Sequence, residues 1–416
     1  MKLLYVVQRY GADIVGGSEA ACRSFAEQLA RRGHEVEVLT SCAHSYVTWE
    51  NHYSPGAETI NGVIVNRLPV SSQRIPAKFG PQDQFLMSGR GRPTWFQHRQ
   101  WAKLMGPDMP DLVPWLIANG PRFDAVIFMT YLYASTTVGL SAVAGRVPVI
   151  FQPTAHDEPP MRIPFFHSIF RQPDSFVFFT PEEREVVREK FFLEPAGVVA
   201  GMGIELNPPR GSTEEFRKTH GLGDDPYAIY VGRLDPMKGV KELCRFFIEY
   251  KKRTHSQIKL VLAGEKLVDL PLTDDIVVTG YLEESDKQAA IKGSMVLVQP
   301  SYFESFSIVL CEGWVQGRPA LVQRASKVLN GQAMRSNGAL PYRGFAEFEA
   351  SLNYLVDNPA IASELGASGR KYVEDNYAWD VVAARFEESL DIARSRFAAR
   401  RTKLSVSDKG VVGRAE

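Results

Sequence analysis

Two glutamates eight residues apart, Glu304 and Glu312, are the side chains of this sequence best suited to chemistry. They follow an apolar run, 295–298, that predicts a buried strand, and they lead into a helical pattern that ends at Gly317. Eight steps of about 100° turn a helix about 80° past two full turns, so one helix could not direct both carboxylates at one atom. We therefore predict that Glu304 lies in the strand-to-helix loop and Glu312 inside the helix, where they contact different parts of one elongated ligand.

A nucleotide sugar would suit such a pair. Ionised carboxylates accept hydrogen bonds from vicinal hydroxyls, which both a ribose and a hexose carry. The backbone N–H groups of Phe306, Ser307 and Ile308 would open the helix and face an anion, here a diphosphate. Paired acids also occur by chance on solvated helices, so the surrounding motifs must decide between the two interpretations.

A second motif lies upstream. The apolar run 227–231 predicts a buried strand, and it is followed by Gly232-Arg-Leu-Asp-Pro-Met-Lys-Gly239 and a helical run, 240–253. A glycine-bounded loop that carries Arg233 and Lys238 between a strand and a helix is typical of phosphate handling, because such cations can neutralise a leaving diphosphate. The alternative is a pair of solvated loop cations, which the neighbouring glutamate pair disfavours.

The ordered set Gly-Arg-Leu-x-x-x-Lys-Gly, then Glu-x7-Glu, resembles the nucleotide-sugar site of retaining GT-B glycosyltransferases of family 4, the group 1 glycosyl transferases. The resemblance extends over nearly the whole chain, as far as Tyr377-Ala-Trp379. It implies an α/β fold of two Rossmann-like domains that face each other across a cleft, with a C-terminal helix that crosses back to the first domain. It also implies transfer without a metal or cofactor. Arg233 and Lys238 would hold the diphosphate, Glu312 the ribose and Glu304 the donor hexose.

Four further residues, in three loops that follow predicted strands, are candidates. Gly16 and Gly17 lie between the first strand and the first helix, where an ordinary flexible turn is the alternative; the resemblance implies that this loop closes over the donor. His156 lies in a Pro-Thr-Ala-His-Asp-Glu segment. The resemblance implies that His156 faces the donor sugar, although a lone histidine is more often structural, and either neighbouring acid could orient its ring. Tyr281 could stack on the base or simply pack.

One departure from the family pattern concerns Ser307, where many relatives carry glycine. The amide of a serine still serves, so donor binding survives. The loop after the last strand of the second sheet, 323–331, is basic where many relatives have an acid, which leaves the donor's identity more open.

Length and composition limit the class of protein. A chain of 416 residues suggests two domains of about 200 residues each. The 48 basic and 48 acidic side chains create no global field that would favour nucleic acid. The four cysteines are scattered without a CxxC motif, which indicates reduced thiols and argues against zinc. The apolar N-terminal stretch is too short for a signal peptide, and no run reaches the ~20 apolar residues that span a bilayer. We expect a cytoplasmic protein, either soluble or peripheral at the inner face of the membrane.

Hydrophobic periodicity predicts alternating strands and helices in both halves, without a GxGxxG fingerprint. The predicted strands lie at 3–7, 36–39, 63–67, 125–128, 147–151, 227–231, 259–263, 276–278, 295–298 and 320–322. The predicted parts are an acceptor domain at 1–205, a linker at 206–226, a nucleotide-sugar domain at 227–375, a returning helix at 376–399 and a flexible tail at 400–416.

The segment 74–103 is unusual in composition. Its basic residues stand at 74, 78, 90, 92, 99 and 103, against Asp83 alone, with Trp95, Phe96 and Trp101 among them. Such a segment could rest on anionic lipid headgroups or hold a phosphorylated acceptor. The alternative is a solvated insertion whose tryptophans face the core.

We therefore expect transfer of one sugar from a nucleoside-diphosphate donor, a UDP-sugar by family frequency, to a hydroxyl of a glycan, a lipid-linked or a small-molecule acceptor, with retention at the anomeric carbon. Nucleic acid is not an expected partner. Three alternatives share the scaffold. They are a nucleotide-sugar 2-epimerase, a sugar phosphorylase or synthase, and a non-catalytic nucleotide-sugar binding protein.

Overall fold

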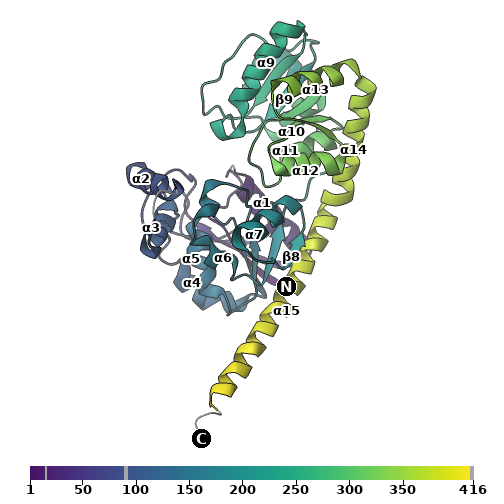
Figure 1. Cartoon of the computed structure of the whole chain (residues 1–416). Coiled ribbons are helices and arrows are strands. Elements are labelled where there is room, and N and C mark those ends of the chain that lie inside the picture. The colour runs from purple at the N-terminus through teal and green to yellow at the C-terminus, as the bar shows by residue number, and fades with distance from the viewer. Residues whose placement is uncertain (15, 89–91, 413–416) are drawn as a thin grey trace. The chain divides into compact units, whose positions relative to one another are not determined.

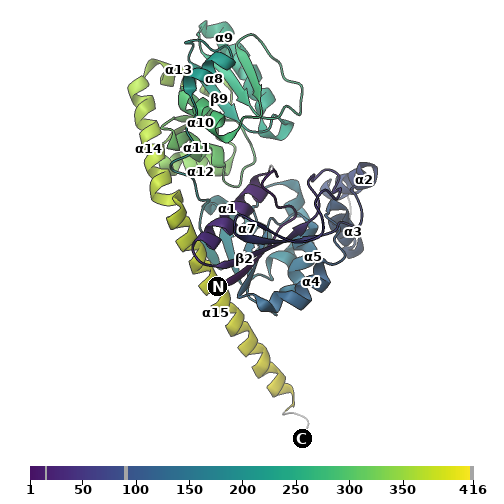
Figure 2. The same cartoon turned by 180° about the vertical axis from the view of Figure 1, so that it is seen from behind.

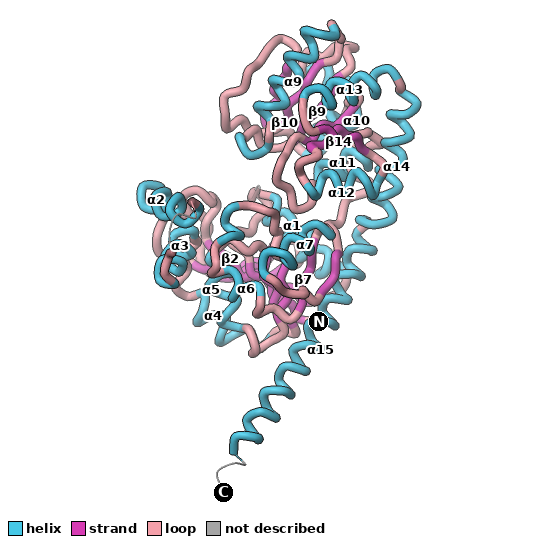
Figure 3. Tube along the Cα trace, in the orientation of Figure 1, coloured by secondary structure: helices cyan, strands magenta, loops and turns pink. Residues whose placement is uncertain are grey.

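The computed structural model describes residues 1–14, 16–88 and 92–412, without side chains for Pro76 and 403–412. The chain forms two compact units. Unit 1 consists of Met1–Ala200 together with the chain from Val382 onward, and unit 2 is Gly201–Val381. Each unit is a Rossmann-like α/β domain with its own hydrophobic core, in which helices surround a largely parallel sheet (Figures 1, 2 and 3).

The sheet of unit 1 has the strand order β3-β4-β2-β1-β5-β6-β7-β8, and only the β3–β4 pair is antiparallel. Its strands are β1 (Lys2–Val6), β2 (Glu35–Ser41), β3 (Gly56–Ile60), β4 (Val63–Leu68), β5 (Ala125–Met129), β6 (Val149–Gln152), β7 (Ser175–Phe178) and β8 (Gly197–Val199). Its helices before residue 200 are α1 (Gly17–Arg31), α2 (Pro76–Met87), α3 (Trp95–Met105), α4 (Leu112–Asn119), η1 (Gly120–Arg122), α5 (Ala134–Val143), η2 (Pro159–Arg162), α6 (Phe166–Phe170) and α7 (Pro181–Phe191).

The sheet of unit 2 has the order β11-β10-β9-β12-β13-β14, and every pair in it is parallel. Its strands are β9 (Tyr227–Val231), β10 (Lys259–Ala263), β11 (Ile276–Gly280), β12 (Val296–Gln299), β13 (Ala320–Gln323) and β14 (Ala339–Tyr342). Its helices are α8 (Thr213–Thr219), η3 (Pro236–Lys238), α9 (Val240–Thr254), α10 (Glu284–Gly293), α11 (Ile308–Val315), α12 (Lys327–Ser336), α13 (Phe345–Asp357) and α14 (Pro359–Tyr377).

The strand order of each sheet defines where a ligand can enter. In unit 1 the chain reverses its direction of travel across the sheet between β1 and β5, and in unit 2 between β9 and β12. Connections on either side of such a switch point leave the sheet in opposite directions, which opens a crevice at the carboxyl ends of the two strands. The loops after β1, β9 and β12 are those that carry Gly16, Arg233, Lys238 and Glu304.

The last helix, α15 (Trp379–Val412), belongs mainly to unit 1, as the fold prediction requires. The side chains of Val382, Phe386, Leu390 and Ala393 recur on one face and are buried. The ring of Phe386 packs against Phe25 at a centroid distance of 5.6 Å. Helix α15 runs past the predicted helix end at 399, because the sequence there contains no proline and no glycine before position 410.

Two stretches of chain lie side by side where it leaves and re-enters unit 1. Ile204 forms a parallel bridge with Ala378, and a side chain at Gly203 would collide with the ring of Trp379. The stretch 206–226, predicted as a linker, contains α8, which contacts α10 within unit 2.

The predicted strands are all present, and their ends differ from the prediction by at most two residues. Four strands were not predicted from the sequence: β3, β7, β8 and β14. They are short or irregular, since β7 has four residues, β8 has three, β14 contains a proline, and β3 is an exposed antiparallel edge. Among the described residues, no helix is both long and apolar enough to cross a bilayer.

Candidate active site

The loop after β9 is shaped by Asp235 and by glycines. The Asp235 carboxylate accepts hydrogen bonds from the backbone N–H groups of Met237 (2.9 Å) and Lys238 (3.2 Å), which fixes the turn that presents the lysine. The guanidinium of Arg233 lies 3.5 Å from the other oxygen of Asp235, and its side chain is 42% exposed. Both predicted phosphate-binding cations are therefore held on one loop.

Close backbone contacts explain the glycines around this loop. A Cβ atom at Gly264, which follows β10, would collide with the carbonyl oxygen of Gly232. A Cβ atom at Gly239 would collide with the carbonyl oxygen of Pro300, which follows β12. Both glycines also have positive φ, 147° and 71°. The loop thus packs tightly on its two neighbouring strands.

Lys238 and Glu304 meet at the switch point of unit 2. The Lys238 Nζ donates a hydrogen bond of 2.8 Å to Glu304 Oε1, and the carboxylate side chain is only 12% exposed. Because Lys238 comes from the loop after β9 and Glu304 from the loop after β12, this pair joins the two loops at which the sheet predicts a ligand. Glu304 lies in the loop and Glu312 inside α11, as their spacing predicted.

The start of α11 shows why many relatives carry glycine at the position of Ser307. Ser307 is the N-cap residue with φ 72° and ψ 77°, a left-handed conformation that glycine adopts without strain. Gln299 Nε2 donates a hydrogen bond of 3.1 Å to Ser307 Oγ, which offsets part of the cost. The Ser307 side chain forms no capping hydrogen bond with the helix, which begins at Ile308. The Phe306 ring is buried and packs edge-on against Tyr377 at 4.8 Å, so it shapes the loop from the core side.

Glu312 pairs with a lysine that the sequence analysis did not select. Lys287 Nζ of α10 donates a hydrogen bond of 2.8 Å to Glu312 Oε1 and lies 2.8 Å from Glu284 Oε2. Burial raises the pKa of Glu312, and the nearby Lys287 ammonium opposes that shift. Glu312 Oε2 is buried and accepts no hydrogen bond from the described residues. A hydroxyl donor on a ligand would satisfy this oxygen.

Tyr281 follows β11 and is 65% exposed. Its ring is thus not part of the core, and stacking on a base stays a prediction.

The glycine pair of unit 1 separates into two roles. Gly16 is the N-cap residue of α1, and a Cβ atom there would collide with the carboxylate of Glu19. Glu19 is buried and accepts a hydrogen bond of 2.9 Å from Arg9 Nε, so Gly16 makes room for a buried ion pair. A Cβ atom at Gly17 would meet nothing within 4 Å. Of these two glycines, Gly17 is the one that borders open space.

His156 is oriented by Glu158. The Nε2 atom lies 3.2 Å from Glu158 Oε2, whereas Asp157 pairs with Lys190 at 2.9 Å. The other oxygen of Glu158 accepts a hydrogen bond of 2.6 Å from Tyr131 Oη. The structure thus selects one of the two acids between which the sequence left the choice open.

The loop of His156 is held by a buried acid, Glu183 of α7. Its carboxylate accepts hydrogen bonds from the backbone N–H groups of Ala155 (2.7 Å) and Phe179 (2.6 Å). Burial raises the pKa of Glu183 to about 8, although these hydrogen bonds lower it. Sequence reasoning missed Glu183, but Thr180-Pro-Glu-Glu183 has the spacing of a helix N-terminal cap and could have identified it.

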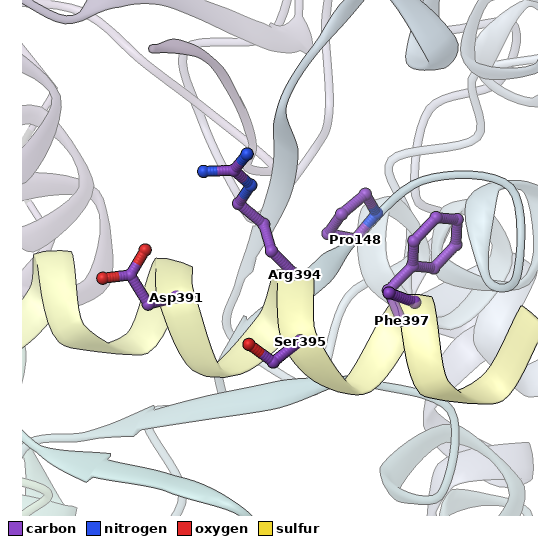
Figure 4. Close-up of a pocket in the computed structure, with 6 residues that line it drawn as sticks. Pro148, Asp391, Arg394, Ser395 and Phe397 are labelled. Carbon is purple, nitrogen blue, oxygen red and sulfur yellow. The ribbon is translucent and has the colours of Figure 1, made fainter.

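A separate hollow of about 430 Å³ lies on unit 1 between α15 and the residue before β6 (Figure 4). It is lined by Pro148, Asp391, Arg394, Ser395, Phe397 and Ala398. Because Pro148 precedes β6, the hollow lies at the amino end of that strand, opposite the edge that carries His156. It contains none of the predicted site residues. Among the residues that the structure describes, no cluster of three or more histidine, cysteine or acidic side chains could hold a metal ion.

Comparison with known proteins identifies the class of protein to which the two units are similar. Residues 212–372 match the family "Glycosyl transferases group 1", and residues 16–200 match the "Glycosyl transferase 4-like domain". The two matches contain all eleven predicted site residues, from Gly16 to Glu312. The chain is a glycosyltransferase of the GT-B type.

Two relatives of this glycosyltransferase match it over nearly their whole length. An uncharacterized glycosyltransferase of Methanocaldococcus jannaschii is 25% identical, over 92% of this chain and 96% of the relative. A glycogen synthase of Mycobacterium tuberculosis is 23% identical, over 92% of each chain. Among solved structures, Anabaena HepE in complex with UDP and glucose shares the fold with a TM-score of 0.68, 14% identity, and coverage of 94% of this chain and 99% of that one.

Proposed function

We propose that this glycosyltransferase transfers a hexose from UDP to a hydroxyl acceptor, with retention at the anomeric carbon and without a metal ion. The observation that carries the proposal is the contact between Lys238 and Glu304 across the switch point of unit 2. One residue of the pair suits a diphosphate and the other suits sugar hydroxyls, so a nucleotide sugar can satisfy both at one place.

The donor would bind along the carboxyl edge of unit 2. Arg233 and Lys238 would contact the diphosphate, and the N-terminus of α11 would add the partial positive charge of its first backbone N–H groups. The buried Oε2 atom of Glu312 would accept a hydrogen bond from a ribose hydroxyl, and the exposed ring of Tyr281 would stack on the uracil. HepE, which shares the fold, holds UDP and glucose in its structure, and this supports a uridine donor.

The reaction would depend on the leaving group. As the bond between the anomeric carbon and the diphosphate breaks, negative charge develops on the diphosphate, where the two cations stabilise it. Glu304 and Glu312 are each paired with a lysine, and neither is a free nucleophile in this arrangement. We therefore propose departure of UDP and attack of the acceptor on the same face. The acceptor, a glycan, lipid-linked or small-molecule hydroxyl, would be held by unit 1 beside Gly17 and His156.

The proposed compartment is the cytoplasm. All four cysteines are buried free thiols, a state that a reducing compartment maintains.

A panel of nucleotide sugars tests the donor. UDP-glucose, GDP-mannose and their free nucleotides are added to the full chain, and the melting temperature is measured. A ligand at 100 times its Kd stabilises the protein by about 2.7 kcal/mol. The proposal requires that a uridine nucleotide raise the melting temperature more than a guanosine nucleotide does. Stabilisation by none of them would overturn it.

Release of UDP from the stabilising donor, measured with and without acceptor sugars, then tests the reaction. A transferase releases UDP faster when an acceptor is present. Release at the same rate without any acceptor, with loss of the sugar's configuration at C2, would indicate an epimerase instead.

A further inference from the structure

The helical hairpin formed by α2 and α3 is not used by the proposed reaction. It lies at one edge of unit 1, in the long connection between β4 and β5 (Figures 1 and 2). The aromatic side chains of this segment differ in burial. Trp101 is fully buried, with its Nε1 donating to Asp83 at 2.9 Å, whereas Trp95 is 54% and Phe96 is 67% exposed. The core-facing alternative therefore holds for one tryptophan only.

The first turns of α3 present aromatic and basic side chains together. Phe96 and Arg99 lie three residues apart on one face of the helix, and both are exposed. Thr94 and Gln97 form a capping box, which fixes the start of the helix. The ring of Trp95 packs on one side against Phe165 at 5.1 Å. The exposed aromatic side chains thus stand on a rigid helix end.

Helix α2 presents the same two kinds of exposed side chain. Lys78 and Phe85 are seven residues apart and so share a face, and both are exposed. Gln82 Nε2 donates a hydrogen bond of 3.1 Å to the carbonyl oxygen of Gln97, which ties α2 to α3. Exposed Arg162 belongs to η2, which contacts α2.

The exposed charges of the hairpin have one sign. Among the described residues 75–88 and 92–103, every exposed charged side chain is cationic, since Asp83 is directed to Trp101. These cations are Lys78, Arg92, Arg99 and Lys103. Arg74 is not among them, because its guanidinium lies over Trp49 and donates to the Met105 carbonyl. Arg90 lies outside the described residues.

We propose that the α2–α3 hairpin docks unit 1 on the surface of an anionic lipid bilayer. Aromatic side chains favour the interface between water and hydrocarbon, and each lysine or arginine near an anionic surface adds attraction. Exposed Trp95, Phe96 and Phe85 would enter the headgroup region while Lys78 and Arg99 contact lipid phosphates. The cationic surface complements that charge, whereas the neutral chain as a whole has no general attraction to polyanions. Docking would bring a lipid-linked acceptor to unit 1.

Vesicle sedimentation of the full chain tests the proposal without any substrate, so its outcome is independent of the proposed reaction. Vesicles of phosphatidylcholine alone are compared with vesicles that contain about one third phosphatidylglycerol, at low and at physiological salt. We expect binding to the anionic vesicles only, weakened by salt. The double variants Trp95→Ser/Phe96→Ser and Lys78→Glu/Arg99→Glu should each reduce vesicle affinity about tenfold or more.

Matched variants control for general effects of surface changes. Tyr354→Ser removes a 45% exposed aromatic side chain from α13, and Arg146→Glu reverses an exposed cation between α5 and β6. Both should bind vesicles as the unchanged protein does, and all variants should melt within a few degrees of it. Absence of binding to anionic vesicles, or equal loss in the control variants, would overturn the proposal. So would a full chain that binds a single-stranded oligonucleotide but no vesicle.

Discussion

Lys287 is the residue whose removal most sharply separates the stability of unit 2 from its binding of a donor. Its ammonium compensates the buried Glu312 carboxylate at 2.8 Å, and the side chains are 18% and 15% exposed. In Lys287→Met the carboxylate keeps its burial but loses its only described hydrogen-bond donor. Breaking one half of a buried pair costs roughly 3–5 kcal/mol, while the second contact, to half-exposed Glu284, contributes under about 1 kcal/mol.

We expect Lys287→Met to destabilise unit 2 by about 3 kcal/mol at pH 8, which for a domain of this size corresponds to a melting temperature lower by about 6–12 °C. The loss should shrink as the pH falls toward 5. Burial already raises the pKa of Glu312, and without the ammonium the folded state would hold a proton more tightly than the unfolded chain, which favours folding at low pH.

The double variant Lys287→Met/Glu312→Met should melt within a few degrees of the unchanged protein, because an apolar pair of similar volume replaces the ion pair. It should nevertheless bind UDP about 10-fold to 100-fold more weakly, since a charged hydrogen bond contributes about 1.5–3 kcal/mol. Calorimetric melting and UDP titration measure the two effects. Lys292→Met, an exposed position on the same helix, is the matched control. Wild-type melting of Lys287→Met at pH 8, or unchanged UDP affinity of the double variant, would refute this reasoning.

Three other predictions follow from the same contacts. Lys238→Ala and Arg233→Ala should mainly lower kcat, by about 100-fold or more for Lys238, with a smaller effect on KM in steady-state kinetics. Because burial raises the pKa of Glu183 from 4.5 to about 8, the folded state keeps a proton that the unfolded chain releases. Stability should then fall by a few kcal/mol between pH 5 and pH 8, and Glu183→Gln should flatten that slope in melting curves. Gly264→Ala should cost more than about 2 kcal/mol through its collision with a carbonyl oxygen, whereas Gly223→Ala, at φ 54° with open space around it, should cost about 1 kcal/mol.

Each of these outcomes has a clear opposite. Near-wild-type turnover of the Lys238 variant would exclude a role for that lysine in leaving-group stabilisation. If stability still falls with rising pH in Glu183→Gln, the pH dependence comes from another titratable group. Equal melting of the two glycine variants would mean that the loop after β9 does not pack closely on β10.

The sequence determined the local features of this protein. The apolar run before Gly232 and the glycines that bound the loop place Arg233 and Lys238 between a strand and a helix, since strand and helix periods are visible within a dozen residues. The separation of Glu304 and Glu312 into loop and helix follows from the same local geometry.

Only the tertiary structure decided which of these elements meet. Ala228 of β9 pairs with Val296 of β12, far along the chain, and this pairing brings Lys238 to Glu304. The choice of Glu158 over Asp157 beside His156 depends likewise on contacts between loops.

The same holds for the side chains that the sequence could not sort by type alone. Lys287 resembled any solvated helix lysine until α10 packed beside α11, and Trp101 is buried while Trp95, six positions earlier, is exposed. Hydrophobic pattern and turn chemistry act between near neighbours and are written in the local sequence. Partners that are distant in the chain are chosen by how whole elements pack, because burial and pairing depend on all the surfaces that meet at one place.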